Sequence, residues 1–308
     1  STKFMNHFSC IPVFVTVVEC GSFSLAAEKL NLTKSAVSKR INQLEDQLGT
    51  RLLNRTTRRL NLTEAGLRYY DYASQANMLA KEGLDAVSEL QGSPQGTLSI
   101  TAPMSFGVLH IAPLIAEFLE EHPQVEINLS LEDQMVDLIE GGFDMAIRIG
   151  NLPDSNLVAK RIAPCYSMLC ASDSYLKKHG EPEKPSDLVN HNCLQYSYFK
   201  GGTEWSFHGP TDRIKVLPKG NLKVNNSEAI RQALLSGLGI AQLPTFLVGK
   251  DIASKKLKPI LKGFPLPEHS IYAMFPERKY LPLKVRVFVD FLHSKLGQGI
   301  PPWDEFYR

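Results

Sequence analysis

Residues 21–66 constrain the fold of this chain more than any other stretch, because their pattern predicts two short helices, a tight turn between them and a hairpin afterwards. Ser22 or Ser24 can cap the first helix and Thr33 the second, since their hydroxyls accept hydrogen bonds from the first helical turn. Gly49 suits the end of the second helix, whose apolar stripe comprises Val37, Ile41, Leu44 and Leu48. Such a helix pair can place its second helix in the major groove of DNA.

Side chains suited to DNA lie outside that stripe. The helices offer short polar or basic groups of the kind that meets base edges: Ser22, Ser24, Thr33, Lys34, Ser35, Ser38, Lys39, Arg40 and Asn42. A predicted hairpin pairs residues 51–55 with 58–62 and has residues 56–57 at its tip. It offers these side chains to the phosphates: Arg51, Arg55, Thr56, Thr57, Arg58 and Arg59.

The local charge agrees with a DNA-binding surface. From Lys29 to Arg68 there are nine basic and three acidic residues, a net charge of +6, although the whole chain carries only +2. An ordinary helical domain with a solvated basic face is the alternative interpretation. The order of cap, stripe, turn and basic hairpin favours DNA binding.

On these residues the segment resembles the N-terminal domain of LysR-type transcriptional regulators, a bacterial family. The resemblance is carried by Gly21-Ser22-Phe23, Ala26-Ala27, Ser35-Ala36-Val37-Ser38, Leu44-Glu45, Leu48-Gly49 and Leu62-Thr63-Glu64-Ala65-Gly66. Further segments, Ala146–Gly150 and Ala229–Pro244, are similar to a large proteobacterial branch of the family. Many members have Gln at the position of Lys34, so the operator sequence cannot be taken from a relative.

The resemblance implies a domain order. It places a winged helix-turn-helix domain at residues 1–62, a linker and dimerisation helix at 63–91 and a hinge at 92–96. An α/β effector domain follows, with two Rossmann-like subdomains like those of type 2 periplasmic binding proteins. Subdomain I comprises residues 97–163 and 268–308, and subdomain II residues 164–267.

The linker segment carries a heptad-like seam of its own: Leu67, Tyr70, Ala73, Asn77, Ala80, Leu84 and Val87. A helix over these 29 residues would span roughly 43 Å. Pairing with the same helix of a second copy would bury the seam, and packing on its own domain is the alternative. We expect a homodimer, and the resemblance implies a homotetramer built from dimers.

Beyond the hinge, strand and helix patterns alternate, which predicts α/β domains with mostly parallel sheets. Expected strands lie at residues 97–102, 125–131, 143–149, 157–162, 166–170, 194–198, 205–207, 221–224, 239–243 and 270–275. Expected helices lie at residues 109–121, 133–140, 174–178, 227–235, 245–250 and 283–296.

Three strand-to-helix junctions, near residues 103, 225 and 244, offer hydroxyl or amide groups at a positive helix end, which suits a carboxylate. The resemblance implies that they converge in one cleft with these effector-binding residues: Thr101, Pro103, Ser105, Phe106, Arg148, Gly150, Trp205, Asn225, Asn226, Pro244, Thr245 and Phe246. Alternatives stay open. Ser105 can be a plain cap, Arg148 can form an ion pair with Asp144 or Asp154, and Trp205 can pack in a core.

Composition adds several exclusions. Apolar residues make up 43% of the 308, and no run is long enough for a membrane span. Residues 1–10 lack the pattern of a secretory signal, and five cysteines without a C-x-x-C indicate reduced thiols, so we expect a cytoplasmic protein. For Cys165, Cys170 and Cys193, burial is favoured over redox sensing.

The sequence also lacks a catalytic pattern. There is no H-E-x-x-H and no G-x-S-x-G, so we expect neither an enzyme nor a metal or cofactor. The expected partners are double-stranded DNA, a small organic effector and, through the family, RNA polymerase. A solute-binding protein without a role in gene control is the second hypothesis. The effector, the target genes and the sign of regulation stay open.

Overall fold

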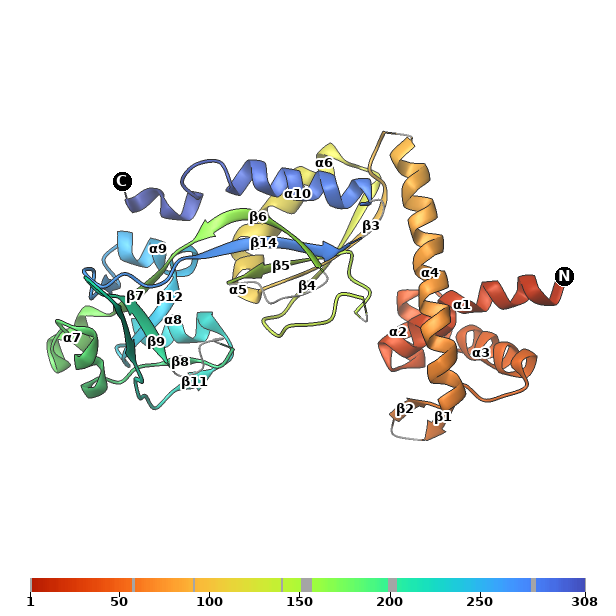
Figure 1. Ribbon diagram of the computed structural model, residues 1–308, viewed down its shortest axis with the longest axis horizontal. Helices are drawn as coiled ribbons and strands as arrows, with labels where there is room; N and C mark the ends of the chain where they lie inside the picture. Colours follow the sequence, from red (N-terminus) through yellow and green to blue (C-terminus); the bar gives the residue numbers. More distant parts are fainter. Residues whose placement is uncertain are drawn as a thin grey trace. The chain divides into compact units, whose positions relative to one another are not determined.

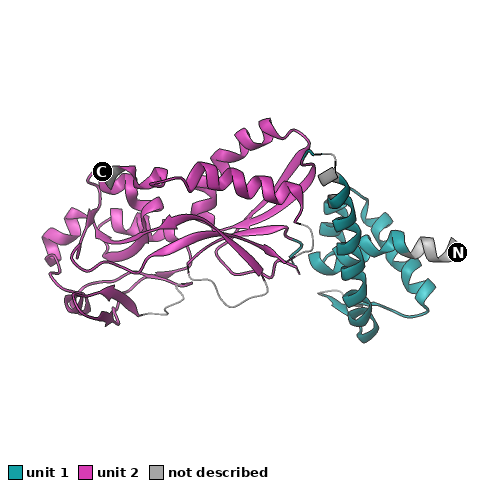
Figure 2. Ribbon diagram, turned by 45° about the horizontal axis from the view of Figure 1, so that its top comes forward, with its two compact units in different colours: residues 1–93, 140–142 teal, residues 94–139, 143–308 magenta. Residues whose placement is uncertain are grey.

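The computed structural model describes residues 2–56, 59–90, 92–139, 141–150, 157–198, 204–277 and 281–307. It contains two compact units (Figure 2). Unit 1 comprises Ser1–Ser93 and Glu140–Gly142, and unit 2 comprises Pro94–Ile139 and Phe143–Arg308.

Unit 1 is built from four helices and a hairpin in the part of the chain described: α1 (Thr2–Cys20), α2 (Phe23–Lys29), α3 (Lys34–Leu48), β1 (Leu53–Thr56), β2 (Arg59–Leu62) and α4 (Glu64–Leu90) (Figure 1). The predicted caps are confirmed. Ser22 Oγ accepts from Leu25 N at 3.5 Å, and Thr33 Oγ1 accepts from Ala36 N at 3.2 Å. Gly49 ends α3 with a left-handed φ of 66°, which glycine adopts at little cost.

Helix α1 was not predicted from the sequence. It contains Pro12, a residue that normally interrupts a helix. Its buried face carries Val13, Phe14 and Val17, which pack with the apolar faces of α2 and α3. Helix α1 therefore completes the core on which α3 rests.

The hairpin has another register than the predicted one, in which residue 53 would face residue 60. Leu53 pairs with Leu62 and Thr56 with Arg59, and residues 57–58 lie outside the described residues. The start of α4 lies close to Leu52, the residue before β1, since a Cβ on Gly66 would lie 2.0 Å from Leu52 O. Only glycine fits there, and this contact sets the hairpin against the start of α4.

The linker seam is only partly buried on its own unit. Ala73 is 3% exposed, whereas Leu67, Leu84 and Val87 are 55%, 72% and 54% exposed, and pairing with a second copy stays a prediction. In the first half of α4, Ala73 is buried against α1, and Tyr69 and Tyr70 lie 5.4 and 6.4 Å from the Phe14 ring. In the second half, Leu79 is also 63% exposed. The first half packs in part on its own unit, and the second presents apolar side chains at its surface.

Unit 2 has two lobes. Lobe I (residues 96–165 and 269–296) holds a sheet in the order β4-β3-β5-β14-β6, made of β3 (Gly96–Ala102), β4 (Val125–Leu131), β5 (Met145–Ile149), β6 (Leu157–Cys165) and β14 (His269–Pro276). Its helical segments are α5 (Met104–Phe106), the π-helical η1 (Gly107–Ile111), α6 (Ala112–Glu121) and α10 (Leu283–Leu296). Helix α10 packs on β3 and β6, and α6 packs on β4 (Figure 1).

Lobe II (residues 167–259) holds a sheet in the order β12-β7-β13, made of β7 (Ser167–Ala171), β12 (Ile240–Pro244) and β13 (Lys258–Pro259). A bridge from Cys193 to Ile240 extends it to the parallel pair β8 (Gln195–Tyr196) and β11 (Lys223–Val224). The remaining elements are the hairpin β9 (Trp205–His208) and β10 (Arg213–Val216), the helices α7 (Asp173–His179), α8 (Ser227–Leu235) and α9 (Thr245–Ala253), and the 3-10 segment η2 (Pro185–Asn190). The C-terminal 3-10 segment η3 (Pro302–Tyr307) packs on α9.

Two predictions for unit 2 were wrong. The sheets are not mostly parallel, since β14 runs antiparallel to β5 and β6, and β7 runs antiparallel to β12 and β13. Alternation of elements gives their order but not their direction. Residues 133–139 form turns rather than a helix, because the Asp133 carboxylate accepts from Met104 N at 2.8 Å and turns the chain back toward α5.

Candidate functional site

Helix α3 presents its predicted DNA-contacting residues on the face opposite the core. Val37, Ile41 and Leu44 are fully buried. The polar residues are exposed (Thr33, Lys34, Ser35, Lys39 and Arg40) or half-exposed (Ser38 and Asn42). On α2, Ser22 is half-exposed and Ser24 is exposed. The surface of α3 therefore combines short hydroxyl side chains with lysines at its N-terminal end.

Arg51 forms an ion pair that the sequence did not indicate. Its Nη1 lies 2.6 Å from Oε2 of Glu45, a side chain that is only 2% exposed. Glu45 Oε1 also accepts hydrogen bonds from Leu52 N at 2.9 Å and Leu53 N at 3.1 Å. Burial opposes ionisation of Glu45, but the hydrogen bonds from Arg51, Leu52 and Leu53 together hold its pKa below the ordinary value. Glu45 thus joins α3 to the first strand of the hairpin.

Glu45 is a positioning residue that the sequence analysis missed. Its only signal was a carboxylate beside Leu44 in the buried stripe of α3. Of the other predicted hairpin residues, Arg55, Thr56 and Arg59 are described only as strand backbone, and Thr57 and Arg58 lie outside the described residues. An open hollow of about 780 Å³ lies where the hairpin meets α4, lined by Gly49, Thr50, Arg51, Thr63, Glu64, Ala65 and Arg68.

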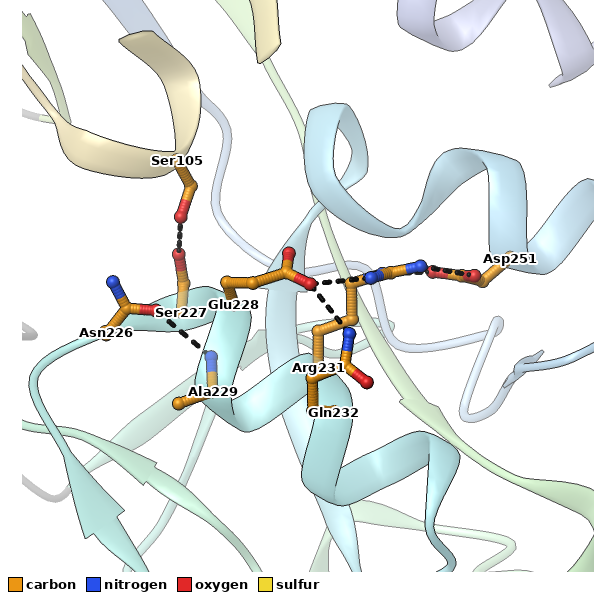
Figure 3. Close-up of polar contacts among 8 residues, drawn as sticks. All are labelled: Ser105, Asn226, Ser227, Glu228, Ala229, Arg231, Gln232 and Asp251. Carbon is orange, nitrogen blue, oxygen red and sulfur yellow. Dashed lines mark hydrogen bonds and ion pairs between the residues drawn. The ribbon is translucent and has the colours of Figure 1, made fainter. Parts of the chain in front are cut away.

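In unit 2, the two lobes meet at two helix starts (Figure 3). Ser105 Oγ of lobe I lies 2.9 Å from Ser227 Oγ of lobe II. Asn226 caps α8 by accepting from Ala229 N at 3.1 Å, and its amide nitrogen lies 3.3 Å from Met104 Sδ. The junctions that follow β3 and β11 are therefore brought together, as the resemblance implies.

Arg148 lies on β5 of the lobe I sheet, next to Thr101 of β3, and is 9% exposed. Its Nη2 donates to Thr101 Oγ1 at 3.1 Å and its Nη1 to Ile147 O at 2.9 Å. Burial lowers its pKa, which Glu132 and Asp133 partly offset. Among the described residues no carboxylate forms an ion pair with Arg148, and Asp144 instead accepts from Ser99 N. The predicted alternative partner Asp154 lies outside the described residues.

Helix α8 is held against α9 by a network that the sequence analysis did not identify (Figure 3). Arg231 donates through Nε and Nη2 to the two oxygens of Asp251, at 2.5 and 2.8 Å, and its Nη1 lies 2.7 Å from Glu228 Oε1. Hydrogen bonds to Asp251 and Glu228 raise the pKa of Arg231. The Asp251 side chain is only 4% exposed. These contacts join α8, which begins at Ser227, to α9.

The predicted aromatic wall of the cleft lies deeper than expected. Phe106 is fully buried, and Phe246 is 7% exposed and packs edge-to-face on it at 5.1 Å. Trp303 of η3 lies 5.5 Å from Phe106, and His110 Nε2 donates to Phe246 O at 3.0 Å. The rings of Phe106, Phe246 and Trp303 belong to one buried cluster.

Trp205 does not line the cleft. It is 4% exposed and packs with Phe207 and Val216 in the core of lobe II, because the β9–β10 hairpin turns its inward face toward that core. The remaining predicted residues lie at strand ends: Thr101 and Thr245 are fully buried, Pro103, Gly150, Asn226 and Pro244 are half-exposed, and Asn225 is exposed.

The thiols of unit 2 are buried. Burial raises the pKa of Cys165, Cys170 and Cys193 to about 12 each, so little thiolate exists near neutral pH. Within the described residues no group of three His, Cys, Asp or Glu could hold a metal ion. None of the described helices is long and apolar enough to cross a membrane.

Two family models match the chain. One describes a bacterial regulatory helix-turn-helix protein of the lysR family and matches residues 10–67. The other describes the LysR substrate binding domain and matches residues 91–297. The chain belongs to the LysR family of transcriptional regulators. Its helix-turn-helix makes this LysR-type regulator a DNA-binding protein, and its larger unit is the family's substrate-binding domain.

Relatives of this LysR-type regulator align over nearly its whole length. The transcriptional regulator PtxR of Pseudomonas aeruginosa is 36% identical over 296 residues, 96% of this chain and 95% of PtxR. The structure of CrgA from Neisseria meningitidis is 36% identical, with a TM-score of 0.62 over 94% of this chain and 99% of that one. A full-length AphB variant is 27% identical, with a TM-score of 0.71 over 93% of this chain and 98% of that one.

Proposed function

We propose that this regulator binds an interrupted inverted-repeat operator as a dimer and that a small carboxylate in the cleft between the lobes changes its DNA-binding state. The contact between Ser105 and Ser227 carries the proposal. It joins hydroxyls from two lobes at the start of α8, and the buried Arg148 of the lobe I sheet is bound to Thr101, four residues before Ser105. An anion in this place would touch both lobes at once.

Support for the DNA-binding surface comes from α3. Lys34 and Lys39 are exposed at or near the end of the helix that meets base edges in helix-turn-helix proteins. We assign base contacts to Lys34, Ser35 and Ser38, and phosphate contacts to Arg55, Arg58 and Arg59. Since Arg51 is paired with Glu45, we assign it a smaller share of the phosphate binding.

Support for a carboxylate comes from the donors at the cleft. The guanidinium of Arg148 has five N–H groups, and the described residues accept from two of its nitrogens. A carboxylate could complete its hydrogen bonding as a two-pronged pair. Because the anion would bind one arrangement of the lobes better than another, it would shift their populations and, through α4, the spacing of the two reading helices.

A thermal-shift screen of small carboxylates on the full chain tests the effector site. A ligand that binds only the folded state raises the melting temperature. We expect a shift in the wild type that is lost in Arg148→Gln and kept in the control Arg213→Gln, which changes an exposed arginine of β10. A carboxylate that stabilises Arg148→Gln as well as the wild type would contradict the site.

DNA binding to the chain's own promoter region tests the reading helix. We expect Lys34→Ala to change the preferred operator sequence and Arg58→Ala to weaken binding to all sequences alike, with a smaller salt dependence. Equal losses for both variants on every DNA would show that these roles are assigned wrongly.

A further inference from the structure

The carboxyl edge of the lobe I sheet carries an acid as well as Arg148. Strand β3 lies between β4 and β5, and Thr101 pairs with Ser130 of β4 and with Ala146 of β5. Residues two apart on a strand point to the same face, so Arg148 shares the face of Ala146 and Glu132 shares the face of Ser130. Glu132 N donates to Ala102 O at 2.9 Å, so the ladder continues through Glu132. Arg148 and Glu132 therefore stand on one face, on either side of Thr101.

A second acid stands next to Glu132, where the two lobes meet. Asp133 accepts from Met104 N at 2.8 Å at the start of α5, and it is near enough to Tyr196 of lobe II to affect the pKa of that hydroxyl. Burial and this acid raise the pKa of Tyr196. Asp133 thus interacts with groups of both lobes, and its partner Met104 is next to Ser105 in the chain.

Glu132 has more hydrogen-bonding capacity left than Asp133. Among the described residues it accepts from Ser130 Oγ, at 3.3 Å. Neither Glu132 nor Asp133 forms an ion pair with Arg148 among the described residues, although both interact with it electrostatically. This edge of the sheet therefore holds a buried cation and, beyond ion-pair contact, two half-buried carboxylates.

This arrangement discriminates between kinds of acid. A ligand whose carboxylate binds Arg148 would have Glu132 on the same face of the sheet, on the other side of Thr101. A ligand with negative charge alone would leave the half-buried Glu132 facing a like charge. An ammonium group next to the carboxylate would give Glu132 a charged hydrogen-bond donor.

We infer that the effector is a small amino acid, with its carboxylate at Arg148 and its ammonium group at Glu132. This rests on the proposed effector site above. Asp133 and Tyr196 would form the rim beside the ammonium group, and the side chain of the amino acid would extend toward Asn226 and Pro244.

Matched pairs of ligands on the full chain test the inference. The twenty standard L-amino acids are screened by thermal shift beside their deaminated counterparts, such as glutarate for glutamate and 3-phenylpropanoate for phenylalanine. Calorimetry then compares the affinities of each responding pair. We expect at least one amino acid to bind about 10- to 100-fold more tightly than its deaminated partner, since hydrogen bonds to charged groups have this strength.

The variant Glu132→Gln should reduce that preference to about threefold or less, by weakening the amino acid and not its deaminated partner. The matched control is Glu126→Gln, an exposed acid at the other end of β4, which should leave the preference unchanged. A deaminated acid that binds the wild type as tightly as its amino acid overturns the inference and leaves the carboxylate site standing. No binding of any compound of either set overturns both.

Discussion

Replacing Glu45 with alanine should loosen the connection between α3 and the hairpin. The change removes the acceptor of three hydrogen bonds, from Leu52 N, Leu53 N and Arg51 Nη1. Hydrogen bonds to a charged group contribute about 1.5–3 kcal/mol each, and the two backbone N–H groups lie on residues that are 1% and 3% exposed. Allowing for water that enters the gap, we expect Glu45→Ala to lower the free energy of opening at this place by about 3 kcal/mol.

Hydrogen exchange of the Leu52 and Leu53 amides on the full chain measures this loss directly. A loss of about 3 kcal/mol makes local opening, and therefore exchange, about 100-fold more frequent. In Glu45→Gln the amide oxygen can still accept from both N–H groups, so we expect a loss of about 1 kcal/mol or less, from the pair with the exposed Arg51. The control is Asp46→Ala, which removes the exposed acid next to Glu45. It should change the free energy of local opening by no more than about 0.5 kcal/mol. Exchange of both amides within threefold of the wild-type rate in Glu45→Ala would refute the positioning role.

The Glu45 carboxylate also predicts a pH dependence of stability. Because the folded-state pKa of Glu45 lies below 4.5, its stabilising contribution should be present above about pH 4.5 and lost as the pH falls through the lower pKa. The measurement is the difference in amide exchange between the wild type and Glu45→Ala, which should shrink as the pH falls. Asp251→Ala should destabilise unit 2 by about 2–3 kcal/mol in chemical unfolding followed by circular dichroism, since it leaves the half-buried Arg231 without its bidentate partner. Leu79→Glu should shift the sedimentation mass toward the monomer with the melting temperature of the monomer unchanged, because that side chain is 63% exposed on α4. The thiol of Cys165 should react with a thiol reagent at pH 8 at least about 100-fold more slowly in the folded than in the unfolded chain, since burial raises its pKa to about 12.

Local signals predicted the elements that carry the candidate sites. Helices α8 and α10 have the bounds that their apolar spacing predicted, and α3 begins after its Thr33 cap and ends before Gly49. Capping residues and a one-sided apolar face act within a few residues, so a sequence can show them. Capping was less predictable in unit 2: the cap of α8 is Asn226 and not Ser227, and Ser105 caps no helix, since α5 begins after Pro103 without a side-chain cap.

The features that the sequence did not predict depend on contacts between residues far apart in the chain. Helix α1 is stabilised by its burial against α2, α3 and α4, which outweighs the effect of Pro12. The turn after β4 depends on the hydrogen bond between Asp133 and Met104, 29 positions apart. The ion pair of Arg51 with Glu45 needs the register between α3 and the hairpin. None of these contacts leaves a periodic pattern in the sequence.

The positions of the two tryptophans have a practical consequence. Trp205 and Trp303 are the two in the chain, and both belong to unit 2. Trp205 lies in the core of lobe II, whereas Trp303 packs against Phe106 of lobe I and Phe246 of lobe II. In a Trp205→Phe variant, the remaining indole would be an intrinsic fluorophore at the joint between the lobes. Its emission would follow ligand binding in real time without a dye, and a change on DNA binding alone would report a signal passing from the reading helices to the lobes.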